Sequence, residues 1–179
     1  MKKIIRAGVF ETNSSSMHSI CIRGTQPERY TQMQISENRM PYNDAGRVSF
    51  YYDELEFGRY PFQMLISAYD KCRYAIASYG ADIVPEVTSI YKEISARVGA
   101  GYPFTHFEFD KDGDGNPDYG YVDHQSSGLL QRFLKDKDIT LKEFILNPNF
   151  YVVIDGDEYY DFDKYLDAGL IEKPQEVYR

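Results

Sequence analysis

The 179-residue sequence contains no tryptophan, only two cysteines and only three histidines. Cys21 and Cys72 lie far apart, so the chain lacks both the cysteine density of a secreted disulfide scaffold and a C-x-x-C pair. We expect two buried, reduced thiols, with a disulfide or a nucleophilic cysteine as the alternatives. No apolar run reaches the length of a signal peptide or a membrane helix, which favours a soluble, cytoplasmic protein.

Positive charge is scarce in the later part of the chain. The formal net charge is -8, yet residues 1–47 contain seven Lys or Arg against four Asp or Glu. Residues 108–167 contain fifteen acidic and six basic residues. Nucleic acid would be repelled by this acidic part, whereas a cationic partner would be attracted to it.

Periodic patterns predict two helices in the middle of the chain. From Pro61 to Tyr79, apolar residues recur at three- and four-residue steps, and Gly80 follows as a stop. A second helix is predicted over 85–98, because Pro85 suits a first turn and apolar residues share one face up to Val98.

Shorter elements surround these helices. Alternating residues predict strands at 4–10, 17–22, 48–52 and 151–155, and a β-hairpin whose arms flank the acidic segment 110–118. Short C-terminal helices are predicted from three caps: Ser126 or Ser127, Thr140 with Glu143, and Asp161. The 42% apolar content is enough for a core, so we expect a single α+β domain over 1–179 with a mixed or antiparallel sheet.

The segment ETNSSSMHS is polar and lies between two apolar stretches. Such residues readily close a turn by bonding their own backbone. Alternatively, they form an anion-binding loop with Lys3 or Arg6 nearby, in which the phosphate-binding residues are Asn13, Ser14, Ser15 and Ser16. A nucleotide-binding enzyme would use such a loop.

Two of the three histidines lie in polar segments and suggest acid–base chemistry. If His18 and His124 meet, one neutral imidazole can remove a ribose 2′-OH proton while the other, protonated, donates to the leaving oxygen. Arg6 or Lys3 would stabilise the charged phosphorane, and Asp123 would orient an imidazole. This predicts a ribonuclease that requires no metal. The alternative is that His18 and His124 each satisfy a local hydrogen bond. We expect His106 to be an ordinary strand residue.

The segment DKDGDGNPD has part of a calcium-loop pattern. Positions 1, 3, 5 and 9 of such a loop are occupied by Asp110, Asp112, Asp114 and Asp118. The pattern fails at position 12, which is Tyr121 instead of a bidentate glutamate, and the flanks are predicted strands. Two interpretations of this segment stay open: a looser Ca²⁺ site and a solvated hairpin tip.

The segment 155–167 is rich in acidic and aromatic residues and also has two interpretations. Its carboxylates and rings either imitate the phosphates and bases of nucleic acid, so that a basic cleft binds them, or form an exposed helix start.

The runs RAGVFETNSSSMHSI (residues 6–20) and YVDHQSSG (residues 121–128) resemble segments of small phage and mobile-element proteins from Gram-positive bacteria. Proteins of that kind include anti-CRISPR inhibitors of type II Cas9 systems. The resemblance implies a protein that inactivates a Cas9 effector or its guide RNA in the host cytoplasm, either by RNA cleavage or as an acidic, non-enzymatic blocker. The oligomeric state is left open.

Overall fold

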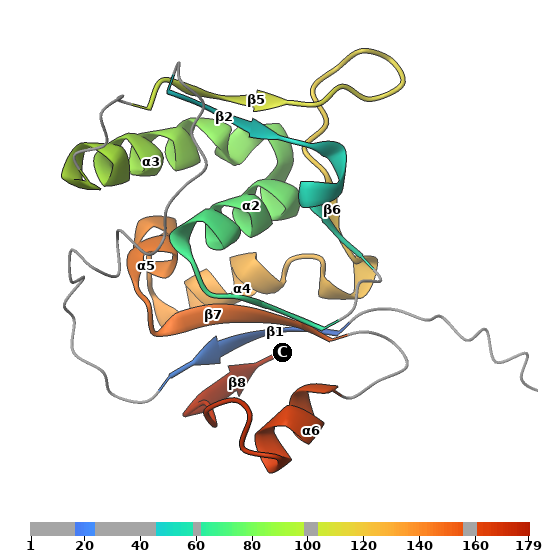
Figure 1. Ribbon diagram of the computed structural model, residues 1–179, viewed down its shortest axis with the longest axis vertical. Helices are drawn as coiled ribbons and strands as arrows, with labels where there is room; N and C mark the ends of the chain where they lie inside the picture. The colour runs from blue at the N-terminus through green and yellow to red at the C-terminus, as the bar shows by residue number, and fades with distance from the viewer. Residues whose placement is uncertain (1–16, 24–45, 59–61, 99–103, 156–160) are drawn as a thin grey trace, which may run out of the picture.

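The main sheet of the protein has four antiparallel strands in the order β4-β7-β1-β8. A computed structural model describes residues 17–23, 46–58, 62–98, 104–155 and 161–179 (Figure 1). In sheet order the strands are Gln63–Leu65, Phe150–Asp155, Met17–Ile22 and Glu176–Tyr178. Because side chains alternate along a strand, Ile20, Val152 and Ile154 face one side of the sheet and Cys21, Tyr151 and Val153 face the other.

Helices cover one face of this sheet and build the larger core. They are α2 (Ala68–Tyr79), α3 (Val84–Val98), α4 (Leu129–Lys137) and α5 (Leu141–Leu146). The hydroxyl of Ser67 accepts the backbone N–H of Asp70 at 3.0 Å and so caps the start of α2. Gly80, at φ +69°, ends α2 and begins the short 3₁₀ helix η2 (Gly80–Ile83).

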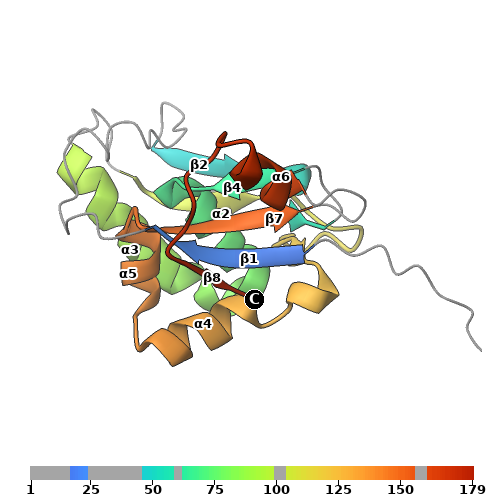
Figure 2. The same cartoon turned by 90° about the horizontal axis from the view of Figure 1, so that it is seen from below.

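The opposite face of the main sheet is covered by α6 (Asp161–Asp167), as Figure 2 shows from below. Phe162 of this helix packs with Cys21, Tyr151 and Val153 in a second, smaller core. The main sheet is therefore buried on both faces, which explains the continuous apolar character of Tyr151–Ile154.

Two small parallel sheets flank the helices: one lies beyond α2 and α3, on the side away from the main sheet, and the other runs beside the end of α2 toward the main sheet (Figure 1). In one, β2 (Arg47–Phe50) pairs with β5 (His106–Phe109). In the other, β3 (Glu56–Phe57) pairs with β6 (Tyr121–Val122). Their inward aromatic residues join the larger core, where Phe50 contacts Phe107 and Phe57 contacts Tyr74.

Much of the predicted α+β architecture is confirmed. The helix expected at 85–98 is α3, and the strands expected at 17–22, 48–52 and 151–155 correspond to β1, β2 and β7. The capping box of α5 is present, because Thr140 Oγ1 accepts the N–H of Glu143 and Glu143 accepts the N–H of Thr140. Both cysteines are free and buried, as expected. The strand predicted at 4–10 lies outside the described residues.

The helix predicted from Pro61 begins later than expected. Its first part, Gln63–Leu65, is the edge strand β4, in which Met64 pairs with Val153 of β7. The period of the apolar residues does not distinguish a short strand from a first helical turn, and pairing with β7 decides in favour of the strand. The helix itself begins after the Ser67 cap.

The predicted hairpin around 110–118 is wrong, because its arms do not pair with each other. Instead, β5 and β6 each pair in parallel with an earlier strand. Only the bridge between Lys111 and Pro117 closes the loop between them. In this arrangement Phe107 is buried in the larger core and Phe109, which is partly buried, packs against it.

The cap predicted at Ser126 or Ser127 is also wrong. Gly128, at φ +76°, precedes α4, and no side chain caps this helix start. Ser126 belongs to the preceding 3₁₀ helix η3 (His124–Ser126), and its hydroxyl bonds to β1. No helix among the described residues is long and apolar enough to span a membrane.

Candidate functional site

The two sequence segments that carry His18 and His124 lie against each other. β1 pairs with β8 only from Ile20 onward, so the backbone of His18 lies beyond this pairing and bonds to a residue outside the sheet. That residue is Ser126 of η3, whose Oγ accepts the backbone N–H of His18 at 3.2 Å. The structure therefore brings together two segments more than a hundred positions apart.

The ring of His18 lies inside the molecule. The residue is only 3% exposed, and its Nδ1 is 3.1 Å from the hydroxyl of Tyr74 on α2. Burial lowers the pKa of His18 to about 4, although the nearby charge of Asp123 opposes this shift. The imidazole is therefore neutral at pH 7 and occupied by a protein partner.

His124, by contrast, lies on the surface. Its side chain is 74% exposed, and its Nδ1 is 3.5 Å from Oδ1 of the largely buried Asp123. The same Oδ1 accepts the N–H of Gln125 at 2.9 Å and caps η3. Asp123 is thus placed to orient His124, but the two histidine rings occupy different surroundings, one buried and one in solvent.

The remaining residues of the predicted RNA or nucleotide site lie outside the described residues. They are Lys3, Arg6, Asn13, Ser14, Ser15 and Ser16. A phosphate-binding role for them stays a prediction.

The carboxylates of the predicted calcium loop form hydrogen bonds within the loop. Oδ1 of Asp112 accepts the N–H groups of Asp114 and Asn116 at 2.9 and 2.8 Å, and these backbone bonds hold the pKa of Asp112 below its ordinary value. Asp118 accepts the N–H of Gly120 at 2.8 Å. Across the described ranges, no group of three or more His, Cys, Asp or Glu side chains is placed to hold a metal ion. A calcium role for Asp110, Asp112, Asp114 and Asp118 stays a prediction.

Lys71 is a buried cation that sequence reasoning missed. The residue is 1% exposed, and its amine donates to the carbonyls of Asn147 and Phe150 at 2.8 and 3.1 Å. Burial lowers its pKa to about 7. Since a neutral amine still has two N–H donors for these two carbonyls, the contact ties α2 to the turn before β7 in either protonation state.

The two small parallel sheets place two acidic segments side by side. The N–H of Asp110 donates to Phe50 O at 3.2 Å, and the N–H of Tyr121 donates to Leu55 O at 3.1 Å. Residues 51–58 contain three carboxylates and no base, and residues 108–118 contain five carboxylates and one lysine. All eight carboxylates of these segments are exposed or half-exposed, and we call them the acidic surface: Asp53, Glu54, Glu56, Glu108, Asp110, Asp112, Asp114 and Asp118.

Sequence reasoning found only half of this surface. The acidity of 108–118 is visible in the composition, whereas its union with 51–58 depends on parallel pairing between strands that are far apart in the chain. Both segments lie at the same end of the small sheets, on the right in Figure 1.

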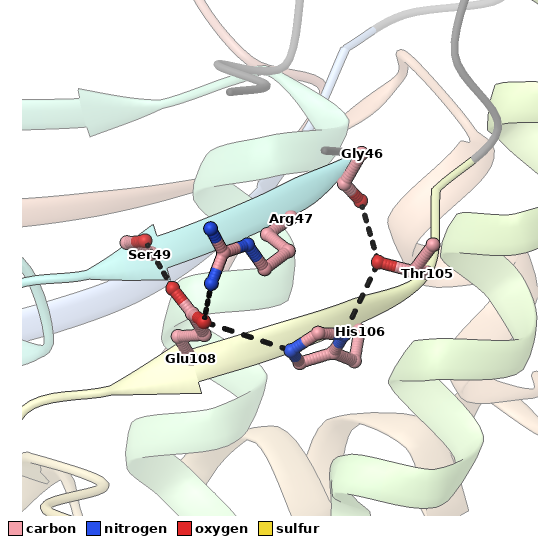
Figure 3. A network of polar contacts seen from close by, with 6 residues as sticks. All are labelled: Gly46, Arg47, Ser49, Thr105, His106 and Glu108. Carbon is pink, nitrogen blue, oxygen red and sulfur yellow. Dashed lines mark hydrogen bonds and ion pairs between the residues drawn. The ribbon is translucent and has the colours of Figure 1, made fainter. Parts of the chain in front are cut away.

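The outer face of β2 and β5 carries a polar network (Figure 3). Arg47 Nη1 donates to Glu108 Oε1 at 2.6 Å, and Ser49 donates to Glu108 Oε2 at 3.1 Å. The bond from Arg47 is the main reason why the pKa of Glu108 is lowered. His106 Nε2 lies 3.7 Å from the same carboxylate.

Beside this network is an open depression of about 410 Å³. Its lining residues come from the ends of β2 and β5: Ser49, Phe50, Tyr51, Glu108, Phe109 and Asp110. Tyr51 is 62% exposed, whereas Tyr121, the other strongly exposed tyrosine among the described residues, is 50% exposed. The site thus combines an aromatic ring with carboxylates.

Comparison of the chain with protein-family models, with curated proteins and with solved structures found no match.

Proposed function

We propose that this protein is a non-enzymatic binding protein whose acidic surface engages a basic surface of a nucleic-acid-binding protein. The observation that carries this proposal is the juxtaposition of residues 51–58 and 108–118, which together contain eight carboxylates and one lysine. A surface of one charge sign attracts the opposite sign and speeds encounter.

Binding is favoured over catalysis by the environment of His18. A general acid or base must reach the proton it transfers, and the His18 ring is buried against Tyr74. The resemblance of residues 6–20 and 121–128 to phage and mobile-element proteins makes a type II Cas9 effector the first partner to test. The protein would then block the effector by occupying its nucleic-acid-binding cleft.

The test is to titrate the protein into a DNA-cleavage reaction with guide-loaded Cas9. We expect inhibition near one-to-one stoichiometry and a guide RNA that stays full length on a denaturing gel. The variant D53N/D110N/D114N should weaken inhibition by about ten-fold or more, because it removes three charges from the acidic surface.

The matched control is D82N/E86Q/E172Q, which removes the same charge from exposed positions outside both acidic segments. It should inhibit like the unmodified protein. Equal losses in the two triple variants, or no inhibition at all, would contradict the proposal. Substoichiometric shortening of the guide RNA that is abolished in His124→Ala would instead establish the ribonuclease.

A further inference from the structure

The depression at the end of β2 and β5 has the chemistry of a receptor for one cationic side chain. Its wall includes the exposed ring of Tyr51 and the carboxylates of Glu108 and Asp110. An aromatic face attracts a cation through its quadrupole, and carboxylates do so through charge. An anion would meet repulsion from the surrounding acidic surface.

Glu108 already binds a guanidinium from within the chain. Its Oε1 accepts from Arg47 at 2.6 Å, while Oε2 is oriented by Ser49 (Figure 3). The carboxylate is thus held in position by two neighbours before any partner arrives. Because the Arg47 side chain is 42% exposed, this ion pair is open to exchange with a second guanidinium.

Arginine suits this site better than lysine. A guanidinium is planar, weakly hydrated and able to stack on a tyrosine while it donates to carboxylates, whereas an ammonium is compact and strongly hydrated. We propose that the depression accepts an arginine side chain of a basic partner protein, held by Tyr51, Glu108 and Asp110. This inference rests on the proposed function and specifies which contact makes the acidic surface selective for a partner with an exposed arginine.

The inference is tested with two fluorescein-labelled peptides of equal charge, GRGRGR and GKGKGK, by fluorescence anisotropy with the full chain. The arginine peptide should bind about three- to five-fold more tightly, because a guanidinium stacks on the tyrosine ring while it donates to the carboxylates and a strongly hydrated ammonium does not. Tyr51→Leu should abolish this ratio. Tyr121→Leu, at a tyrosine that is 50% exposed but outside the depression, should keep it.

Arg47→Met provides a test in the opposite direction. It releases Glu108 from its internal partner, so the arginine peptide should bind more tightly and the ratio between the peptides should increase. Equal binding of the two peptides by the unmodified protein, or an unchanged ratio in Tyr51→Leu, would overturn the arginine site. If Cas9 inhibition still depends on the acidic surface in that case, the proposed function stands without this contact. Absence of both peptide binding and Cas9 inhibition would overturn both.

Discussion

His18 is a buried neutral imidazole at the junction of β1, α2 and η3. Its residue type and strand were evident from the sequence, but its surroundings were not. In a strand with one face on the helices and one on α6, both faces are buried, so alternation alone does not tell which neighbour a side chain meets. The contact with Tyr74 depends on how α2 crosses the sheet, and this is a tertiary property.

The buried imidazole makes stability sensitive to acid. In the unfolded chain His18 takes up a proton near pH 6.5, whereas in the folded protein its pKa is about 4. The unfolded state therefore binds more protons between these values, and stability is lost as the pH falls through this window. At pH 4.5 the loss from this group is about 2 to 3 kcal/mol relative to pH 7.

The measurement is urea unfolding of the unmodified protein and of His18→Gln at pH 7 and pH 4.5. The variant should lose less stability between the two pH values, because glutamine does not titrate, while the carboxylates contribute equally in both proteins. An identical acid loss in the two proteins would contradict the buried, neutral state of His18.

At the level of elements, local signals predicted α3, α5 and β7, and long-range pairing explains the errors. These three elements are signalled by residues close together in the chain, so the sequence alone predicts them. The signals are Pro85, the Thr140–Glu143 capping box and the apolar run at 151–154. The strand β4 and the parallel partners of β5 and β6 depend on distant segments. The acidic surface was half predicted for the same reason.

A substitution at Gly120 tests the parallel pairing of β3 with β6. Gly120 has φ +65°, and a Cβ at this position would collide with the backbone carbonyl of Leu55, just before β3. Gly120→Ala should therefore destabilise the protein by about 2 kcal/mol or more, since it adds a backbone clash to left-handed strain.

Gly115→Ala is the matched control. Gly115 also has a positive φ, +85°, but an added Cβ would meet nothing within 4 Å. It should cost only about 1 kcal/mol of left-handed strain. Thermal or urea unfolding of the two variants checks this order, and equal destabilisation would show that β3 and β6 do not approach each other as closely as described.

At the scale of the whole molecule, charge is the property that the proposal depends on. Association driven by exposed charges is screened by salt, with a Debye length of about 10 Å at 0.1 M and about 3 Å at 1 M. The association rate constant of the GRGRGR peptide should therefore fall by about ten-fold between low and high ionic strength. Stopped-flow fluorescence measures this rate. A rate that does not respond to salt would contradict an electrostatic role for the acidic surface.

The parallel pairing also determines when this surface can exist. Gly46 and Thr105, which bond at the start of the β2–β5 pair, are 59 positions apart, and α2 and α3 lie between them in the chain. To form a contact between residues this far apart in sequence, the chain first loses the conformational entropy of closing a long loop, and only then gains the energy of the contact. Such contacts therefore form slowly. A nascent chain on the ribosome lacks the second acidic segment until the codons for residues 108–118 have been translated. The two acidic segments are therefore brought together only after the chain up to Val122 has been translated and both parallel pairs have formed.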